Sequence, residues 1–532
     1  MPRTYSVVTP VYDPPADVLG EAIDSVRAQT YGDWQLILVD DASPSPHVVE
    51  LLRRYAELDD RIVVIERSTN GGIVAASNDG LAAATGDFVA LLDHDDTLVR
   101  DALALVDLYA DRYPEMDYCY SDEDLLDRHG DHVAPFYKPE WSPERLRSQN
   151  YCGHLSVFSS GLLERIGGFR PGFDGSQDYD LFLRATEAAR QIVHIPFVLY
   201  HWRQIATSVA SGDPTVKLYA YEAGRRAIQE HCARVGIDAA VEIAEHLGNY
   251  RLRRSVGATE TTSVVMATSG ASGRVWGVER AFAVDAVRSV VASTSRPLEF
   301  VVVHGPSTPA TVVEAIGRAA GSVPLTLVEH GRDDDVSAMA NLGVLHATGD
   351  YVVLLDDDVE VITPEFLDPL VALAGSPGVG AVGPKMYFSD GRVQSGGHVY
   401  NGGPHDIMHG RAAYEVGPGG LLAVQREVSG LNGSCLLLAR DVFLDVGGFS
   451  PQLTGPLADV DLNLKIRRRG LERIWTPHVE IHHFESAHRH GPPSSADREF
   501  LEQRWGDQLR FDPYSNPNLA AGRNDWVERG LR

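Results

Sequence analysis

The chain has little cysteine and no long apolar run. Its 532 residues include four cysteines without paired spacing, which argues against a disulfide framework and a zinc knuckle. The longest apolar runs, such as VVLL, have the length of a strand and fall far short of the roughly 20 residues that a membrane helix needs. The N-terminus also lacks the apolar stretch of a signal peptide. We therefore expect a cytoplasmic protein.

Basic residues are few as well. The 47 lysines and arginines are outnumbered by 74 acidic residues, which gives a net charge of −27. Such a field repels the phosphate backbone of nucleic acids. The densest basic run is only the RRR at 467–469. We therefore expect no nucleic-acid partner.

The pattern that is present is one of strands alternating with helices. Leu19, Ile23 and Val26 mark one face of a helix at 17–30, and strand-like apolar runs lie at 5–11, 34–41, 61–67 and 87–93. Continuous apolar strands separated by helices predict an α/β fold with a mostly parallel sheet covered on both faces. Ligands of such sheets collect beyond the carboxyl ends of the strands. The acidic motifs VDD and LLDHDD both fall there.

The chain also contains a long-range repeat. GDFVALLDHDD at 86–96 recurs as GDYVVLLDDDV at 349–359, an offset of 263 residues. Other features follow in the same order with a slowly growing offset: Asn78 with Asn341, GGF at 167–169 with 447–449, Asp178 with Asp459, and His201 with His483. A chance echo of one acidic loop would not keep this order, so the repeat predicts a tandem duplication with loop insertions.

The repeat divides the chain into four segments. We assign residues 1–210 to an N-terminal domain, 211–258 to a helical appendix and linker, 259–490 to a C-terminal domain, and 491–532 to a tail. The prolines and asparagines of the tail fit an ordered docking segment and a frayed end equally well.

Paired carboxylates at a strand end are suited to a divalent cation. Oxygen ligands favour Mg²⁺ or Mn²⁺, and a nearby imidazole such as His201 shifts the preference toward Mn²⁺. A metal there neutralises a diphosphate leaving group. Taken singly, each feature has an ordinary explanation, because Asp-rich turns cap helices, Asp178 is a helix cap and His201 suits a packed edge position. Their joint recurrence favours the functional interpretation.

With these motifs the chain resembles tandem glycosyltransferases of family 2, the inverting group with the GT-A nucleotide-sugar fold. The segments that carry the resemblance in the first copy are SVVTPVYDPP, LVDDASP, NGGIVAASNDGL, LLDHDD, GSQDYDLFLR and LYHWR. Those in the second copy are ATGDYVVLLDDDVEVITPEFL, LNGSCLLLARDVFLDVGGF, ADVDLNLKIRRRG and the HHFESAHRH segment. The resemblance extends to the tail DPYSNPNL, which is similar to that of two-domain bacterial enzymes that build O-antigen, rhamnan and related surface polysaccharides. It implies two tandem, Rossmann-like GT-A domains.

The resemblance implies roles for residues of the first copy. Asp178 would be the base that deprotonates the acceptor hydroxyl. The metal ligands would be Asp93, Asp95 and His201, and the donor nucleotide would be held by Thr9, Tyr12, Asp41, Asn78 and Asp93. The donor implied is a UDP- or dTDP-sugar rather than a GDP-sugar. The acceptor implied is a glycan or a lipid-linked glycan, which would bring the protein to the inner face of the membrane.

The second copy keeps only part of this pattern. Asp459 would be its base, Asp356, Asp358 and His483 its metal ligands, and Asp356 would also face the donor. However, His304 and Gly305 stand where the first copy has Asp40 and Asp41. We expect an active second site with altered nucleotide handling. The alternative is a non-catalytic domain that binds acceptor or self-associates.

A third class of function is disfavoured by the first strand. A nucleotidyltransferase on a related sheet needs a glycine-rich, basic phosphate loop after that strand. The segment TPVYDPP has neither glycine nor a cation. The sequence therefore favours a bifunctional, metal-dependent glycosyltransferase with one site in each domain.

Overall fold

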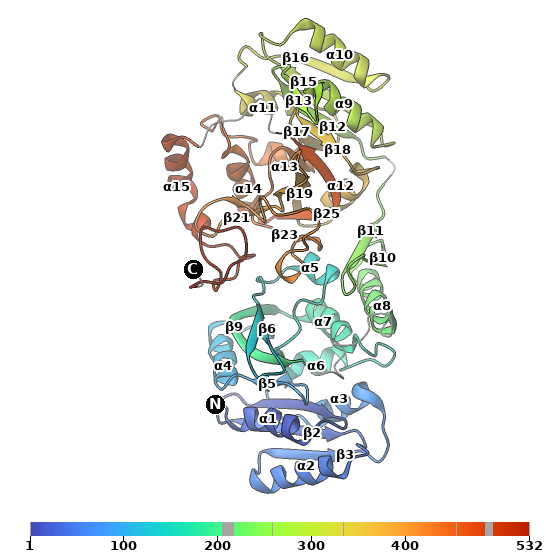
Figure 1. The fold of residues 1–532 in the computed structure, drawn as a ribbon, viewed down its shortest axis with the longest axis vertical. Helices are drawn as coiled ribbons and strands as arrows, with labels where there is room; N and C mark the ends of the chain where they lie inside the picture. Colours follow the sequence, from blue (N-terminus) through green and yellow to red (C-terminus); the bar gives the residue numbers. More distant parts are fainter. Residues whose placement is uncertain are drawn as a thin grey trace. The chain divides into compact units, whose positions relative to one another are not determined.

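The computed structural model describes residues 2–204, 218–257, 259–333, 335–453, 455–484 and 493–530. The chain forms two compact units (Figure 1). The first unit contains the residues up to 252, except 143–145, together with 516–518 of the tail; the second contains the rest. Residues 218–252, which the sequence suggested as an appendix and linker, thus pack within the first unit. The suggested limits at 210 and 490 lie outside the described residues.

The first unit is built on a mixed sheet. Its strand order is β3-β2-β1-β4-β8-β6-β9-β5, with β7 paired to β6. Strands β3, β2, β1 and β4 are parallel, whereas β8 runs antiparallel to β4 and β6. The bounds are β1 Tyr5–Val11, β2 Trp34–Asp40, β3 Ile62–Glu66, β4 Phe88–Leu91, β5 Thr97–Leu98, β6 Met116–Leu126, β7 His132–Phe136, β8 Ser156–Ser159 and β9 Gln191–Arg203.

Helices cover both faces of this sheet. Buried side chains of α1, α2 and α4 form one core, and those of α3, α6, α7 and α8 form the other. The first of these helices follows the expected spacing, since Leu19, Ile23 and Val26 are all buried. The bounds are α1 Ala16–Arg27, α2 Pro46–Leu58, α3 Gly72–Ala83, α4 Ala102–Arg112, α5 Pro143–Ser148, α6 Ser160–Ile166, α7 Gln177–Ala188 and α8 Leu218–Val235, followed by the hairpin β10 Ala239–Ile243 and β11 Tyr250–Arg254.

The second unit repeats the same topology. Its strand order, β16-β15-β12-β17-β24-β19-β25-β18, matches that of the first unit position by position. The expected α/β fold class, two Rossmann-like sheets in tandem, is therefore confirmed. The strand bounds are β12 Thr262–Thr268, β13 Ser272–Val275, β14 Val278–Ala281, β15 Leu298–His304, β16 Leu325–Glu329, β17 Tyr351–Leu355, β18 Val359–Val361, β19 Val379–Tyr387, β20 Val393–Ser395, β21 His398–Val399, β22 His405–Asp406, β23 Arg426–Glu427, β24 Cys435–Ala439 and β25 Glu472–His483.

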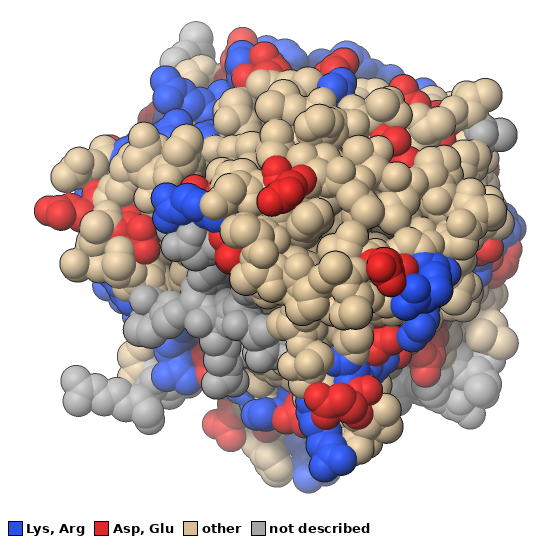
Figure 2. All heavy atoms as spheres, turned by 90° about the horizontal axis from the view of Figure 1, so that it is seen from above, with Lys and Arg blue, Asp and Glu red and all other residues tan. Residues whose placement is uncertain are grey.

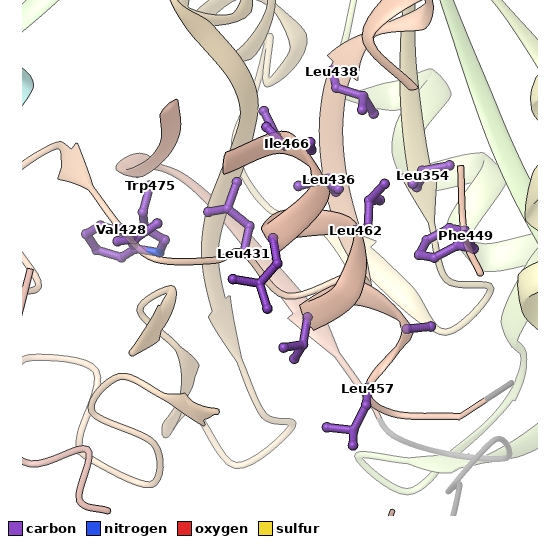
Figure 3. Close-up of a cluster of buried hydrophobic side chains, with 14 of the residues drawn as sticks. Leu354, Val428, Leu431, Leu436, Leu438, Phe449, Leu457, Leu462, Ile466 and Trp475 are labelled. Carbon is purple, nitrogen blue, oxygen red and sulfur yellow. The ribbon is translucent and has the colours of Figure 1, made fainter. Parts of the chain in front are cut away.

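The helices of the second unit again form two cores. One contains side chains of α9, α10 and α12, and the other those of α11, α13, α14 and α15. Figure 3 shows Leu462 and Ile466 of α14 packed with Leu436 of β24 in the second of these cores. The bounds are α9 Phe282–Ala292, α10 Ala310–Ala320, α11 Val336–His346, α12 Leu367–Ala374, α13 Arg440–Asp445, α14 Ala458–Arg468 and α15 Ser495–Arg510.

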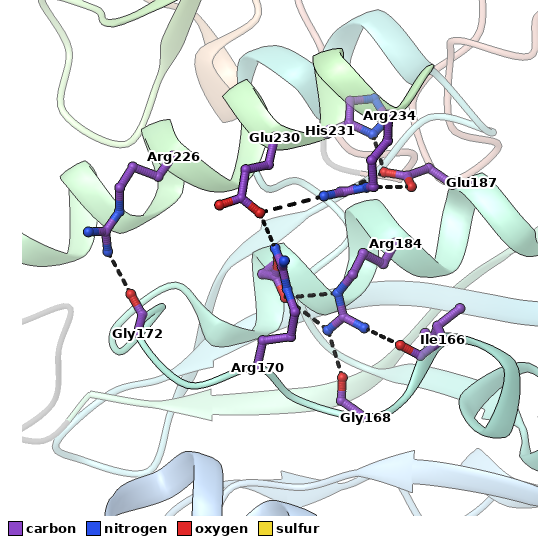
Figure 4. Close-up of polar contacts among 11 residues, drawn as sticks. Ile166, Gly168, Arg170, Gly172, Arg184, Glu187, Arg226, Glu230, His231 and Arg234 are labelled. Atoms are coloured by element: carbon purple, nitrogen blue, oxygen red, sulfur yellow. Dashed lines mark hydrogen bonds and ion pairs between the residues drawn. The ribbon is translucent and has the colours of Figure 1, made fainter. Parts of the chain in front are cut away.

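A buried aspartate anchors the helix α7 in the first unit. The Asp180 side chain is fully buried and pairs with both Arg170 and Arg184. Arg184 also donates to the carbonyl of Gly168 at 2.6 Å, and Arg170 pairs with Glu230 of α8 (Figure 4). Arg170 thus links Asp180 of α7 to Glu230 of α8 by ion pairs. These ion pairs, as well as packing, fix the orientation of α7.

The equivalent helix α14 has the same anchor with different partners. Asp461 is fully buried and accepts hydrogen bonds from Trp505 Nε1 of α15 at 2.8 Å and from Ser450 Oγ at 2.7 Å. Lys465 pairs with it at 3.1 Å and donates to the Gly448 carbonyl at 2.7 Å, as Arg184 does to Gly168. The helices α7 and α14 both begin with two aspartates one residue apart, a D-x-D motif. In both units the second of these aspartates, Asp180 or Asp461, is therefore structural.

Among the helices of the described ranges, none is long and apolar enough to cross a bilayer. Figure 2 shows one face of the molecule, on which acidic and basic side chains lie in small separate groups between uncharged surface. The four cysteines are buried, and none of them is in a disulfide.

Candidate active sites

The second unit brings its three predicted metal ligands together. His483 Nε2 lies 3.1 Å from Asp358 Oδ1 and 3.6 Å from Asp356 Oδ2, at the carboxyl end of β17. The other ring nitrogen, Nδ1, is 2.9 Å from Gln394 Oε1. A proton on Nδ1 leaves the Nε2 lone pair facing the carboxylates, which is how a second partner prepares a histidine to bind metal. Two carboxylates and one imidazole fit Mn²⁺.

This cluster lies in a cavity of about 600 Å³ within the second unit. Its lining includes Thr268, Asp333, Asp356, His398, Asp459 and His483. Asp459, at the start of α14, accepts from the Gly433 N–H at 3.0 Å and from the Val460 N–H at 2.7 Å. Burial raises the pKa of Asp356 and of Asp459. The volume is in the range of small-ligand sites, and the predicted base and metal ligands share it.

The first unit forms its cluster from a different histidine. Asp93, Asp96 and His154 offer ligand atoms that lie within 4.8 Å of one another. Asp96 is already committed, because its two carboxylate oxygens accept from Tyr200 Oη at 2.6 Å and from the Arg203 N–H at 2.7 Å. The ring of His154 stacks on Tyr200, with centroids 4.5 Å apart. Burial, together with the nearby Asp93 carboxylate, raises the pKa of Asp95.

His201 lies in a separate group of possible metal ligands, with Asp124 and His132. It contacts Asp124, with Nδ1 2.6 Å from Oδ1, beside His132. The strand registers explain the difference. Thr97 pairs with His201 in the first unit. In the second unit His483 pairs with Val359, which by the offset of 263 corresponds to the residue before Thr97. The equivalent of His201 is thus His482, and that of His483 is Trp202. A one-residue slip on a strand moves a side chain to the opposite face.

The two units therefore place an imidazole beside their carboxylates from different elements. The registers of β8 and β24 make Ser434 the equivalent of His154. Ser434 Oγ lies 3.4 Å from His483 Nε2. One unit has histidine before β8 and tryptophan on β9; the other has serine before β24 and histidine on β25. Sequence reasoning missed His154 because it looked for the imidazole on the strand alone.

This exchange gives a testable prediction. The measurement uses the full chain carrying Asp358→Asn, in which the metal site of the second unit is weakened. In this background His154→Ala should weaken Mn²⁺ binding at least about tenfold. Even the loss of a residue that only hydrogen-bonds to a metal ligand costs about 10- to 100-fold in affinity. His201→Ala should leave the affinity unchanged. Electron paramagnetic resonance of free Mn²⁺ measures both. The reverse ranking would restore His201 as the ligand.

The base position of the first unit is also formed. Asp178, in the first turn of α7, accepts from Asn150 Nδ2 at 3.0 Å. Burial is the main factor that raises its pKa, and the nearby His154 opposes that shift. A carboxylate that is held by an amide and partly stripped of water suits a general base near neutral pH.

The residues predicted to bind the donor in the first unit are mostly committed elsewhere. The two oxygens of Asp41 accept from Arg67 Nη1 at 2.5 Å and from the N–H groups of Gly71 and Gly72 at 2.9 and 2.7 Å. Thr9 is buried within β1, whereas Tyr12 is 51% exposed at its end. Tyr12 therefore remains available to stack on a base, and Asp41 shapes the loop that enters α3.

Asn78 is used for structure in the same way. Its amide donates to the Phe169 carbonyl and accepts from the Phe169 N–H, both at 2.9 Å. Asn341 makes the same pair of contacts with Phe449, at 3.0 and 2.8 Å. The repeat of this asparagine is real, and in both units its side chain holds the Gly-Gly-Phe loop.

The second unit replaces the missing strand-end carboxylate from another segment. Gly305 occupies the position of Asp41, and a Cβ atom added there would lie 1.8 Å from Asp333 Oδ1. Asp333 comes from the loop between β16 and α11 and accepts from the Ser307 N–H at 3.2 Å. A carboxylate thus fills the space that the strand leaves empty, and it lines the cavity. Nothing in the local sequence around His304 and Gly305 signals this replacement.

Comparison with known proteins places these sites in a family. Residues 6–167 and 278–446 match the family described as Glycosyl transferase family 2. The uncharacterised protein y4gI of Sinorhizobium fredii is 39% identical over 98% of this chain and 58% of its own length. The O-antigen biosynthesis protein RfbC of Myxococcus xanthus is 36% identical over 98% of this chain and 40% of its own length. This chain thus spans about half the length of these two relatives.

A solved structure was matched as well. The crystal structure of S. aureus TarS residues 1–349 in complex with UDP-GlcNAc is 20% identical, covering 43% of this chain and 66% of that one, with a TM-score of 0.36.

Proposed function

The chain belongs to glycosyl transferase family 2, and from that premise we propose a bifunctional, metal-dependent, inverting glycosyltransferase with one site in each unit. The donor is a nucleotide-diphosphate sugar with UDP or dTDP, and the acceptor is a growing surface polysaccharide or a lipid-linked glycan. The observation that carries the proposal is the recurrence of a carboxylate and imidazole cluster, with a buried aspartate nearby, at equivalent strand ends of both units. The relation to an O-antigen biosynthesis protein supports the polysaccharide acceptor.

The proposed reaction assigns a task to each side chain. Asp178 or Asp459 removes the proton from the acceptor hydroxyl, whose oxygen then bonds to the anomeric carbon from the face opposite the leaving group. The bond from that carbon to the diphosphate breaks, and the nucleoside diphosphate departs with inversion at the carbon. A bound Mn²⁺ or Mg²⁺ supplies neutralising charge for the diphosphate. In the first unit the metal would be held by Asp93, Asp95 and His154. We assign Asp95 rather than Asp96 because both oxygens of Asp96 already accept hydrogen bonds. In the second unit it would be held by Asp356, Asp358 and His483.

The donor side of the second unit supports turnover rather than scaffolding. Its cavity already contains a carboxylate at the strand end, supplied by Asp333 in place of Asp41. A carboxylate there can accept the N–H of a pyrimidine base. The loss of the Asp pair at His304 and Gly305 therefore does not argue for an inactive site.

Removal of one metal ligand from each site tests this function. We expect Asp95→Asn to abolish transfer by the first unit and Asp358→Asn to abolish transfer by the second, because each loses charge opposite the diphosphate. Sugar transfer is measured with UDP- and dTDP-sugars on glycan and lipid-linked acceptors. If Asp95→Asn alone removes activity on every acceptor, the second unit is non-catalytic. As a parallel test, a donor nucleotide with Mn²⁺ should raise the melting temperature, because it binds the folded state.

A further inference from the structure

The second unit has an insertion beside its base that the first unit lacks. The registers give an offset of 263 residues between β6 and β19 but 280 between β8 and β24. The segment between the two strands is thus 17 residues longer in the second unit (280 − 263). It contains the hairpin of β21 and β22, which places His398 and Asp406 on the cavity wall next to Asp459.

His398 lies between two carboxylates. Its Nε2 atom is 3.4 Å from Asp406 Oδ1 and 3.9 Å from Asp459 Oδ2. The residue is only 5% exposed, its backbone N–H donates to the Gly430 carbonyl at 2.7 Å, and Nδ1 has no hydrogen-bond partner among the described residues. The polar edge of the ring is therefore directed at the two acidic groups.

Position 430, beside this imidazole, is glycine. By the offset of 280, Gly430 is the equivalent of Asn150, whose amide holds the base of the first unit. A Cβ atom at Gly430 would lie 2.0 Å from Tyr400 Oη and 3.1 Å from His398 Nδ1. A side chain at this position is thus excluded mainly by Tyr400 of the inserted segment, and in the second unit the inserted imidazole, rather than a strand-side amide, is directed at the base.

The charges around the pair agree with this geometry. Burial alone would lower the pKa of His398, but Asp406 and Asp459 raise it above the usual value. Burial raises the pKa of Asp459, His398 lowers it, and Asp406 raises it slightly. The ionisable groups of the inserted segment near the base include His398, Asp406, the more distant Tyr400 and His405, which lines the same cavity.

We propose that His398, held by Asp406, is a positioning residue of the second site, which orients Asp459 and supplies the positive charge that favours its carboxylate form. The inference rests on the proposed function of Asp459 as a base. It gives the two sites different electrostatics, because the first unit uses the neutral amide of Asn150 for the same position.

The test is the pH dependence of transfer by the second site. In the full chain with Asp178→Asn, His398→Gln should shift the acid limb of the kcat/KM profile upward by about one pH unit or more, since an opposite charge at this distance moves a carboxyl pKa by 1 to 3 units. Activity needs ionised Asp459, so the loss should be largest on the acid side of the profile, where a shift of one unit costs up to about tenfold, and activity should recover toward alkaline pH. Equal loss at every pH would mean a merely structural role and would overturn the inference.

A matched variant and a second measurement isolate the effect. In the chain with Asp459→Asn, Asn150→Ala should lower first-site transfer and move its acid limb upward by less than His398→Gln moves that of the second site, because the amide stabilises the Asp178 carboxylate by a hydrogen bond without a net charge. Independently of turnover, ¹³C-histidine NMR of the full chain should show a lower pKa for His398 in Asp459→Asn than in the wild type. An unchanged His398 titration would refute the pairing. Absence of any transfer by the wild-type chain would instead refute the proposed function.

Discussion

Asp178→Asn and Asp459→Asn should each stop transfer at one linkage and leave the other intact. The substitution keeps the shape of the side chain, and an asparagine oxygen can still accept from Asn150 or from the Gly433 N–H. The amide cannot take a proton at neutral pH, and loss of a positioned base costs about 10²- to 10⁴-fold in rate. Mass spectrometry of the acceptor after incubation with both donors measures the outcome.

Two active sites predict a specific product pattern. Each single variant should yield acceptor that is extended by the sugar of the intact site and then blocked, and the double variant should yield none. If Asp459→Asn extends the acceptor as far as the wild type does, the second unit does not catalyse. That result would favour the alternative of one active domain with a binding or self-associating partner.

Asp180→Ala and Asp461→Ala should have the largest effects on stability. Each removes the carboxylate from a fully buried ion pair and leaves Arg184 or Lys465 as an uncompensated cation, which costs about 3–5 kcal/mol. Hydrogen exchange followed by mass spectrometry resolves the two units, since a two-domain chain does not unfold in one step. Exchange should rise in α7 for the first variant and in α14 for the second.

A neighbouring aspartate provides the control. Asp174 is exposed in the loop before α7, so Asp174→Ala should change exchange in α7 by little. In the first turn of α7, loss of the Asp178 carboxylate should abolish activity with little loss of stability, whereas loss of Asp180 should lower stability first of all. Equal stability of Asp180→Ala and Asp174→Ala would contradict the assigned anchor.

The sequence predicted the parts of the sites that are local in the chain. Asp356 and Asp358 end an apolar strand, and Asp178 and Asp459 begin helices, so their positions follow from the fold. The agreement in strand order between the two sheets follows from the repeat in the same way. These features depend on the period of the apolar residues and on the spacing of motifs along the chain, and both can be read from the sequence.

The parts that the sequence missed depend on which segment fills a given space. His201 was assigned by an offset that was one residue too long, and on a strand that error reverses the face. His154 and Asp333 reach the sites from loops, and His398 from the inserted hairpin. Asp333 occupies the volume left free by Gly305, as Tyr400 of the inserted segment does beside Gly430. Which distant segment fills a given space cannot be predicted from the spacing of residues along the chain.

The pairing of Gly305 with Asp333 also constrains how the two copies can change or be recombined. An aspartate restored at position 305 would place a second carboxylate where one already lies, and loss of Asp333 alone would leave none. The effect of a substitution at one of these positions therefore depends on the residue at the other. The end of β2 from the first unit could replace the end of β15 only if the loop before α11 were exchanged with it. Chimeras of the two units must move both segments together, and the duplicated halves are no longer interchangeable parts.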